Sequence, residues 1–229
     1  RGTATAAAAA GRTYRVEVLR EEPLVALIRN FAGKDECRAL VRAGGKESAM
    51  QRASVETNNK AAAARADVRR SYTSSIQLHY SDSKGLVSGL VARSFDVVKR
   101  LTGYDFGLEG QEALSINLYK DLGDEFRLHC DGPCLGEPYT PGERAATSLL
   151  YCKAAKRGGA TLFMRDLLKI VPAPGDLLVF SYRANRSSPA GSEAVHSACP
   201  LEAGKKWVAT QWYREGVSAS FPAAMAEQA

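Results

Sequence analysis

The sequence predicts a single α+β domain that is mainly β, because strand-like stretches fill its second half and helical patterns are confined to its first half. After Leu114 the chain alternates between short apolar runs and turns rich in Gly, Pro and Asp. Many short strands with frequent turns are typical of a double-sheet jelly roll. The expected strands are 114–119, 126–131, 145–151, 160–163, 168–171, 176–181, 194–197 and 206–213.

The first half supplies further strands and two helices. Residues 14–19 alternate between apolar and polar, and 24–28 are apolar, so both stretches are expected to form strands. A short helix is expected at 34–43, where a pair of glycines ends it. A longer helix is expected to begin at Ser81-Asp82-Ser83 and to keep a 3.6-residue apolar stripe until Gly103. This stripe predicts that the helix packs on the outside of a sheet.

The length of 229 residues and the hydrophobic content of 45% suffice for the core of one sizeable domain. We expect a disordered alanine-rich tail at 1–12, the domain at 13–215 and a C-terminal tail at 216–229. No apolar run reaches the roughly 20 residues that a membrane helix needs. The chain does not begin with Met, so we expect a fragment that lacks an upstream targeting or anchoring segment.

The net charge of +6 raises the question of an acidic partner or nucleic acid. The lysines and arginines are scattered, and they form no basic stripe interleaved with aromatic residues. A solvated basic surface is therefore expected, and a nucleic-acid partner is not.

The five cysteines, at positions 37, 130, 134, 152 and 199, are too few for a disulfide scaffold and lack paired zinc-binding spacing. Their odd number leaves at least one thiol free unless it pairs with another chain. A single bridge, for example between Cys130 and Cys134, remains open in an oxidising compartment. The pairing is not fixed by the sequence.

The most informative motif is His129-Cys130-Asp131, followed much later by His196. Two imidazoles and one carboxylate form the facial triad of iron(II) oxygenases, which leaves positions open for a co-substrate and O2. Residues two apart in a strand share a face, so His129 and Asp131 are expected to point together into the barrel. His196 must then come from a facing strand. The third histidine, His79, has no such context and is expected to be an ordinary polar residue.

A lysine follows His196 by ten residues. Lys206, Val208, Thr210 and Trp212 share one strand face by period two, and the barrel interior is the consistent side for all four. A lysine in the interior is costly unless an anion pairs with it. Its neighbour Lys205 is expected to face outward.

Five stretches closely resemble the catalytic domain of the prolyl 4-hydroxylases, which are iron(II)- and 2-oxoglutarate-dependent dioxygenases. They are 115–119, 144–151, 158–161, 174–180 and 196–207. The resemblance runs from about Pro23 to Arg214 and is most specific after Leu114. It implies a double-stranded β-helix, the jelly roll of this family, buttressed by N-terminal helices.

The resemblance also implies roles for individual residues. It implies that His129, Asp131 and His196 bind iron and that Lys206 binds the distal carboxylate of 2-oxoglutarate. Tyr119 and Thr147 would help to seat 2-oxoglutarate. Trp212 would lie beside the active site, and Arg70 would bind substrate. For Trp212 the alternative is core filling. Tyr119 lies ten residues before His129, one more than in the family members. The alignment at Arg70 can slip by one residue.

The resemblance implies hydroxylation of peptidyl proline at the 4-position, with Fe(II), 2-oxoglutarate and O2, ascorbate as reductant, and release of succinate and CO2. The partner is then a proline-containing peptide or protein. One alternative is the same chemistry on peptidyl lysine or a nucleic-acid base. Another is a non-catalytic jelly-roll interaction module, in which a broken triad is expected, whereas this chain keeps every ligand.

In the family, the region equivalent to 46–69 includes a mobile loop that closes over substrate, and the alternative is a plain surface loop. The resemblance favours the endoplasmic reticulum or secretory pathway, with the cytoplasm as the alternative. Neither the oligomeric state nor the protein substrate follows from the sequence.

Overall fold

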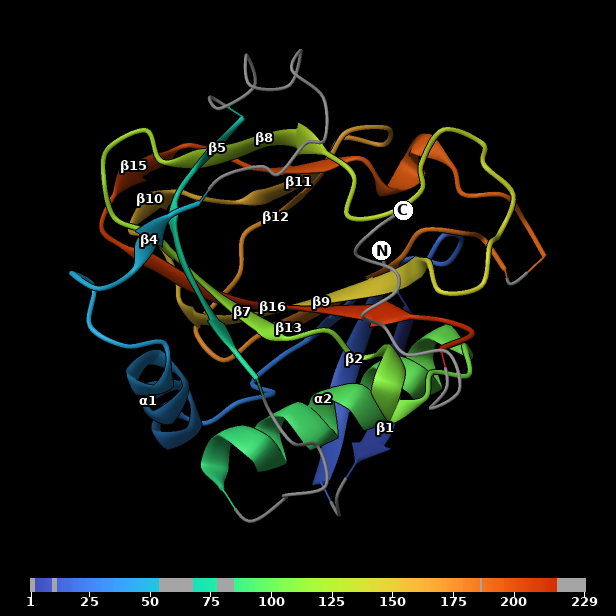
Figure 1. The fold of residues 1–229 in the computed structure, drawn as a ribbon, viewed down its shortest axis with the longest axis horizontal. Helices are drawn as coiled ribbons and strands as arrows, with labels where there is room; N and C mark the ends of the chain where they lie inside the picture. The colour runs from blue at the N-terminus through green and yellow to red at the C-terminus, as the bar shows by residue number, and fades with distance from the viewer. Residues whose placement is uncertain (1–2, 10–11, 54–67, 78–84, 186, 218–229) are drawn as a thin grey trace.

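The computed structural model describes residues 3–9, 12–53, 68–77, 85–185 and 187–217. Within these ranges two antiparallel sheets face each other, and two helices lie against the outer face of the larger sheet (Figure 1). The arrangement confirms the predicted mainly β jelly roll with helices outside it. Among the described residues, no helix is long and apolar enough to span a membrane.

The larger sheet has the strand order β1-β2-β3-β13-β9-β16-β7-β6-β4. Its strands are β1 (Thr3–Ala9), β2 (Arg12–Arg20), β3 (Val25–Ile28), β4 (Gln51–Arg52), β6 (Tyr72–Ile76), β7 (Leu114–Tyr119), β9 (Arg144–Lys153), β13 (Leu177–Ser181) and β16 (Lys206–Arg214). The central pairs β9–β16 and β16–β7 hold the strands that supply this sheet's part of the site.

The smaller sheet has the order β12-β11-β14-β8-β5, and a separate two-stranded pair lies beside it. Its strands are β5 (Arg69–Arg70), β8 (Glu125–His129), β11 (Thr161–Phe163), β12 (Leu168–Ile170) and β14 (His196–Ala198), and the pair is β10 (Arg157–Gly158) with β15 (Leu201–Ala203). Each of the strands expected after Leu114 overlaps an observed strand.

The helices are α1 (Lys34–Ala43) and α2 (Leu86–Thr102), with short 3₁₀ helices at Leu108–Gly110 and Ser192–Ala194. The bounds of α1 agree with the prediction. The helix α2 ends at Gly103, as predicted, where a left-handed backbone with φ of 68° suits glycine. The expected start at Ser81-Asp82-Ser83 lies outside the described residues.

Strand alternation creates two apolar cores, one on each side of the larger sheet. Ile116 on β7 and Ala209 on β16 face the helices and join the outer core. Val208 on β16 faces the opposite way and packs with Phe163 and Phe180 between the two sheets. The same alternation turns several polar side chains of β7 and β16 into the space between the sheets, where the site lies.

The N-terminal segment differs from the prediction. Thr3–Ala9 forms β1 and pairs with β2, whereas a disordered tail was expected over 1–12. A run of alanines has no alternation of polar and apolar residues, so its sequence does not indicate a strand. The backbone of β1 nevertheless pairs with the open edge of β2, and such pairing requires no particular side-chain pattern. Most of the expected C-terminal tail lies outside the described residues, as do 54–67 of the expected loop at 46–69.

Candidate active site

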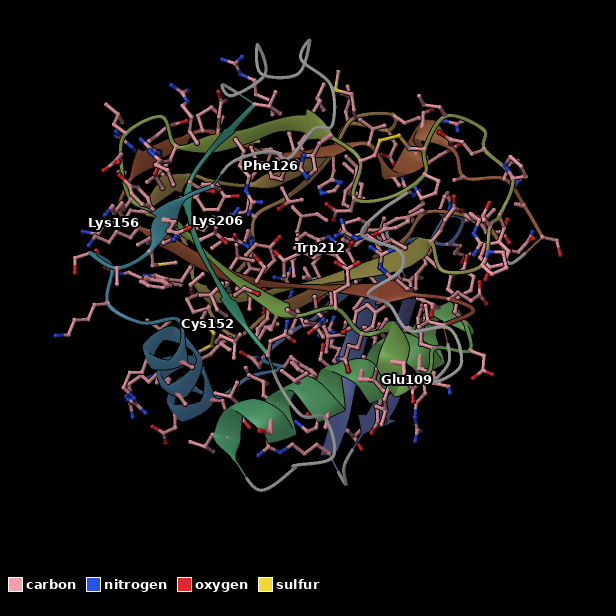
Figure 2. All side chains as sticks on the ribbon, in the orientation of Figure 1. Glu109, Phe126, Cys152, Lys156, Lys206 and Trp212 are labelled. Atoms are coloured by element: carbon pink, nitrogen blue, oxygen red, sulfur yellow. A yellow bond between two sulfur atoms is a disulfide. The ribbon has the colours of Figure 1, made fainter. Side chains whose placement is uncertain are left out.

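A cavity lies between the two sheets. It is lined by Arg69, Asn117, Tyr119, Phe126, His129, Asp131, Leu149, Tyr151, Thr161, His196, Ser197, Ala198, Lys206, Val208, Thr210 and Trp212. The lining includes the four alternate residues of β16 that the sequence assigns to the interior. Figure 2 shows Phe126, Lys206 and Trp212 in the space between the sheets.

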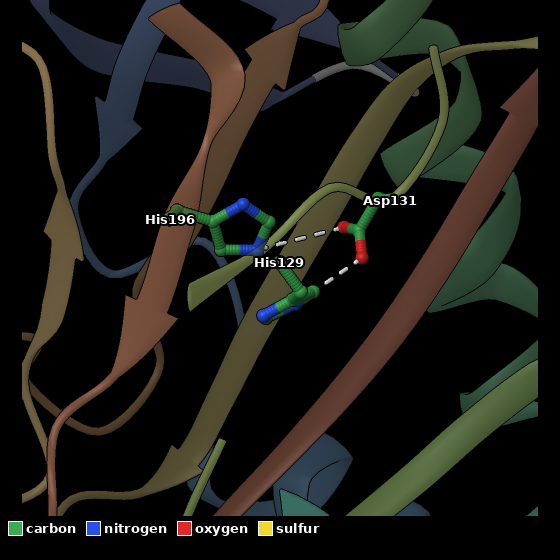
Figure 3. A group of neighbouring side chains, drawn as sticks. All are labelled: His129, Asp131 and His196. Atoms are coloured by element: carbon green, nitrogen blue, oxygen red, sulfur yellow. Dashed lines mark ion pairs between the residues drawn. The ribbon is translucent and has the colours of Figure 1, made fainter. Parts of the chain in front are cut away.

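The two histidines and the aspartate of the predicted triad meet at one wall of this cavity (Figure 3). His129 ends β8, His196 begins β14, and the two residues are direct partners in the smaller sheet. Asp131 lies just past the end of β8. Its Oδ1 is 3.5 Å from His129 Nε2, and its Oδ2 is 3.7 Å from His196 Nε2. One ligand atom from each residue lies within 4.8 Å of the others, a spacing that suits one metal ion.

Backbone carbonyls orient both imidazole rings. His129 Nδ1 is 2.7 Å from the carbonyl oxygen of Arg127, and His196 Nδ1 is 2.9 Å from that of Ala194. A carbonyl oxygen only accepts, so Nδ1 donates in each ring, and Nε2 is the nitrogen that faces Asp131 and the cavity. This backing hydrogen bond is the usual partner of a metal-binding histidine.

The protonation states also suit a metal. Burial on its own would raise the pKa of Asp131, but the neighbouring imidazoles and the Thr147 hydroxyl outweigh it and hold that pKa well below its usual range. Burial, aided by His129, lowers the pKa of His196 to about 4. At neutral pH the aspartate is therefore ionised and His196 is neutral, which is the state in which both groups bind metals.

Lys206 lies in the same cavity and is 2% exposed. Its Nζ donates to the carbonyl oxygen of Gly159 at 2.8 Å and lies 5.0 and 5.4 Å from the ring centroids of Tyr119 and Tyr151. Burial lowers the pKa of Lys206 to about 8. Within the described ranges no carboxylate pairs with it. A buried ammonium without an anion is costly, so the cavity suits an anionic ligand at this end.

The other predicted site residues divide into two groups. Tyr119 on β7 and Trp212 on β16 line the cavity, and the guanidinium of Arg144 stacks 4.2 Å from the Trp212 ring. Thr147 does not line it. Its Oγ1 instead donates to Asp131 Oδ2 at 2.8 Å and forms a hydrogen bond with the Tyr182 hydroxyl. The structure therefore places Thr147 in contact with the aspartate, and its role in seating 2-oxoglutarate stays a prediction.

The arginine at the cavity is Arg69, one residue before the predicted Arg70. The guanidinium of Arg69 lies 4.8 Å from the ring of Phe126, and its Nη2 donates to Asn117 Oδ1. Arg70 points away and pairs with Glu125 at 2.9 Å. Because the two arginines are adjacent, only the strand register decides which one faces inward, and the sequence leaves that register open.

Sequence reasoning also missed other polar side chains of the site, among them Asn117, Tyr151 and Tyr182. Asn117 shares a face of β7 with Tyr119 by period two, and its Nδ2 donates to Thr210 Oγ1 at 3.1 Å. Tyr151 shares the inner face of β9 with Thr147 in the same way. The period-two rule would have found both. Tyr182 lies past the end of β13, and no pattern marks it.

Comparison with known proteins provides evidence on the family that this chain resembles. Residues 114–214 match the sequence profile of the 2OG-Fe(II) oxygenase superfamily. The chain is 27% identical to prolyl 4-hydroxylase subunit alpha-3 of Rattus norvegicus over 88% of its own length and 35% of the relative. It therefore spans about a third of that relative. With prolyl 4-hydroxylase 13 of Arabidopsis thaliana it shares 26% identity over 84% of this chain and 72% of the relative.

A solved structure shows the same fold. The viral collagen prolyl hydroxylase of Paramecium bursaria Chlorella virus-1, in its 2OG complex, superposes with a TM-score of 0.64 at 21% identity. The match covers 83% of this chain and 96% of the viral one. Residues 114–214 thus match the 2OG-Fe(II) oxygenase superfamily, and the resemblance to prolyl 4-hydroxylases that the motifs predict is confirmed over most of the chain.

Proposed function

We propose that this chain is an iron(II)- and 2-oxoglutarate-dependent dioxygenase that hydroxylates peptidyl proline at the 4-position. The observation that carries the proposal is the pairing, in one cavity, of a His-Asp-His cluster with a buried lysine that has no carboxylate partner in the described chain. The cluster fits a divalent iron, and the lysine fits the free carboxylate of a dicarboxylic co-substrate.

In this proposal His129, Asp131 and His196 hold the iron, and Lys206 binds the distal carboxylate of 2-oxoglutarate. Tyr119 lies beside Lys206, so its ring shields that ion pair from water. The bound iron, 2-oxoglutarate and O2 supply an oxidant that inserts one oxygen atom into a C–H bond, with succinate and CO2 as co-products. The protein contributes position and a dry environment.

The proline assignment rests on the relatives, whose names identify them as prolyl hydroxylases. A proline in an extended polyproline II segment also suits such a site, because little conformational entropy is lost when a groove binds it. Arg69 and Trp212 line the cavity and are the side chains that we assign to contact with the peptide.

The alternatives receive less support. A lysine or nucleic-acid base as substrate would keep the triad, but the relatives reported above are named as prolyl hydroxylases. A non-catalytic module has no need for an oriented triad, or for a buried lysine that finds no carboxylate partner among the described residues. Such groups are costly in a fold that does not use them.

We also propose the endoplasmic reticulum or secretory pathway as the location, with the cytoplasm as the alternative. Disulfides join Cys37 to Cys152 and Cys130 to Cys134, and such bridges form and persist in oxidising compartments. Ascorbate is expected as the reductant that keeps the iron ferrous.

The test is mass spectrometry of a proline-rich peptide after incubation with the protein, iron(II), ascorbate and 2-oxoglutarate. We expect the gain of one oxygen atom at proline C4 and release of one succinate for each hydroxylation.

Replacement of His129, Asp131 or His196 by Ala should abolish both products, because each change removes one of three protein ligands. Near-normal turnover in His196→Ala would contradict the proposal. If lysine peptides or nucleic acid gained oxygen and proline peptides did not, the protein would still be a dioxygenase, but the assignment of proline as its substrate would be wrong.

A further inference from the structure

One disulfide of this chain lies inside the metal-ligand motif. Cys130, between His129 and Asp131, is bonded to Cys134. His129 and Asp131 line the cavity and Cys130 does not, as expected for side chains that alternate along an extended segment. The cross-link therefore lies behind the ligands, on the backbone that carries them.

The sheet does not hold Asp131 directly. Strand β8 ends at His129, so the aspartate lies beyond the last residue of its ladder. Its backbone carbonyl accepts from Arg144 Nη1 at 3.0 Å, and its side chain accepts from Thr147. These contacts restrain Asp131 from the side of β9. The disulfide restrains the same turn from the other end, at Cys134.

The turn is also tightly packed. A Cβ on Gly132 would lie 2.6 Å from a ring carbon of Tyr182, so the backbone after Asp131 is pressed against that ring. Cys134 is buried, whereas Leu135, the next residue, is 83% exposed. The disulfide thus closes a compact turn at the point where the chain leaves the protein interior for a surface loop.

Chain entropy points to a local role for this bridge. Only four positions separate Cys130 from Cys134, whereas 115 separate Cys37 from Cys152. A cross-link stabilises a fold mainly by restricting the unfolded chain, and the effect grows with the length of the loop that it closes. The short bridge should contribute less to global stability than the long one, and its effect should fall on the residues beside it.

We propose that the Cys130–Cys134 disulfide is a positioning element of the metal centre, which holds Asp131 against the two imidazoles and tightens metal binding. The inference rests on the proposed function, because it takes His129, Asp131 and His196 as the metal ligands. Loss of the bridge frees the turn, so the carboxylate spends less time in the ligand geometry and the metal binds more weakly.

The test compares two double variants by titration with Co(II) alone, a spectroscopic substitute for iron(II). Cys130→Ser/Cys134→Ser removes the short bridge, and Cys37→Ser/Cys152→Ser is the matched control that removes the long one. We expect the first to weaken Co(II) binding by about tenfold or more and to alter the visible absorption of bound Co(II), as loss of an outer contact to a ligand does. The control should bind Co(II) like the unaltered protein and show the larger fall in Tm.

The outcomes separate the two proposals. Failure of the unaltered protein to bind Co(II) would overturn the proposed function. Normal Co(II) binding by Cys130→Ser/Cys134→Ser would overturn the positioning role alone. Equal weakening in both variants would overturn it as well, because the effect would then follow general stability.

A second measurement does not require that Cys130→Ser/Cys134→Ser folds. In Cys37→Ser/Cys152→Ser, which retains Cys130, Cys134 and Cys199, a water-soluble phosphine is used to reduce the remaining bridge. The S–S bond breaks and two thiols form with two protons from water, while the phosphine takes the oxygen of that water and becomes its oxide. After removal of the phosphine, Co(II) affinity should fall and then recover on oxidation with oxidised glutathione, with the near-UV circular dichroism of the folded protein retained. Unchanged Co(II) affinity in the reduced, folded protein would overturn the proposal.

Discussion

Lys205 and Lys206 are adjacent, yet strand alternation gives them different environments. Lys206 is buried in the cavity, whereas Lys205 is partly exposed and pairs with Glu47 at 2.6 Å. We predict that Lys206→Ala raises the KM for 2-oxoglutarate by roughly 10- to 150-fold, since a charge-assisted hydrogen bond is worth about 1.5–3 kcal/mol. Lys205→Ala should change it less than about twofold, because Lys205 does not line the cavity and its partly exposed ion pair with Glu47 is weak. Steady-state kinetics with 2-oxoglutarate as the varied substrate tests this, and similar behaviour of the two variants would contradict the proposed role of Lys206.

The ionisation of Lys206 adds a dependence on pH. Burial lowers its pKa to about 8, so the free protein loses the ammonium as the pH rises through 8. An anionic co-substrate binds the charged form and must therefore bring a proton with it at higher pH. We predict that the KM for 2-oxoglutarate is constant below about pH 7.5 and then rises toward tenfold for each further pH unit. In Lys206→Ala the KM should be high and should lack this rise, and a rise of the same size in that variant would assign the titration to another group.

At the residue scale, the sequence correctly predicted that the triad and Lys206 point into the space between the sheets. It predicted the contacts around them less well. H-x-D spacing on a strand and the period of two along β16 determine which side chains point inward, so local alternation suffices for that prediction. Arg69 and Arg70 are adjacent, so a shift of one residue exchanges their roles. The contact between Thr147 and Asp131 joins β9 to the turn after β8, and such a contact depends on tertiary packing that no local pattern contains.

Among the elements, prediction succeeded where a side-chain period is strong. The bounds of α1 and the end of α2 agree with the expected residues because apolar stripes and glycines mark them. Strand β6 (Tyr72–Ile76) was missed, since its sequence Tyr-Thr-Ser-Ser-Ile is largely polar and its residues are only partly buried. It is specified by pairing with β7, and β1 is likewise specified by pairing with β2. Backbone pairing of this kind leaves little trace in a single sequence.

The two helices are joined by a buried ion pair. Arg93 of α2 donates to Glu36 of α1 at 2.7 Å and to the Tyr14 hydroxyl at 3.1 Å, and both charged residues are buried. We predict that Arg93→Ala lowers the free energy of unfolding by about 3 kcal/mol or more, because it leaves a buried carboxylate without its main partner. Arg38→Ala, which removes an exposed pair with Asp35 on α1, should cost under about 0.5 kcal/mol. Chemical denaturation measures both, and a cost below about 1 kcal/mol for Arg93→Ala would contradict the assigned role.

At the scale of the whole molecule, the site divides between the two sheets. The histidines of the triad belong to β8 and β14 of the smaller sheet, and Lys206 belongs to β16 of the larger sheet. A co-substrate that reaches from the metal to Lys206 therefore joins the sheets across their shared cavity. Because only the folded protein assembles both ends, binding of such a ligand must stabilise the fold as a whole.

We predict that iron(II) and 2-oxoglutarate together, without O2, raise the Tm by roughly 10–20 °C when each is present at about 100 times its Kd, because the two contributions add. Saturation of that degree is worth about 2.7 kcal/mol for one ligand, and 1 kcal/mol shifts the Tm of a chain of this size by about 2–4 °C. In Lys206→Ala, at the same ligand concentrations, iron(II) alone should still raise the Tm. The further rise from 2-oxoglutarate should be largely lost, because 2-oxoglutarate then keeps its contact with the smaller sheet through the metal and loses its contact with the larger sheet. Differential scanning fluorimetry under nitrogen measures both increments. If 2-oxoglutarate stabilised Lys206→Ala as much as the unaltered protein, the co-substrate would not bridge the two sheets through this lysine.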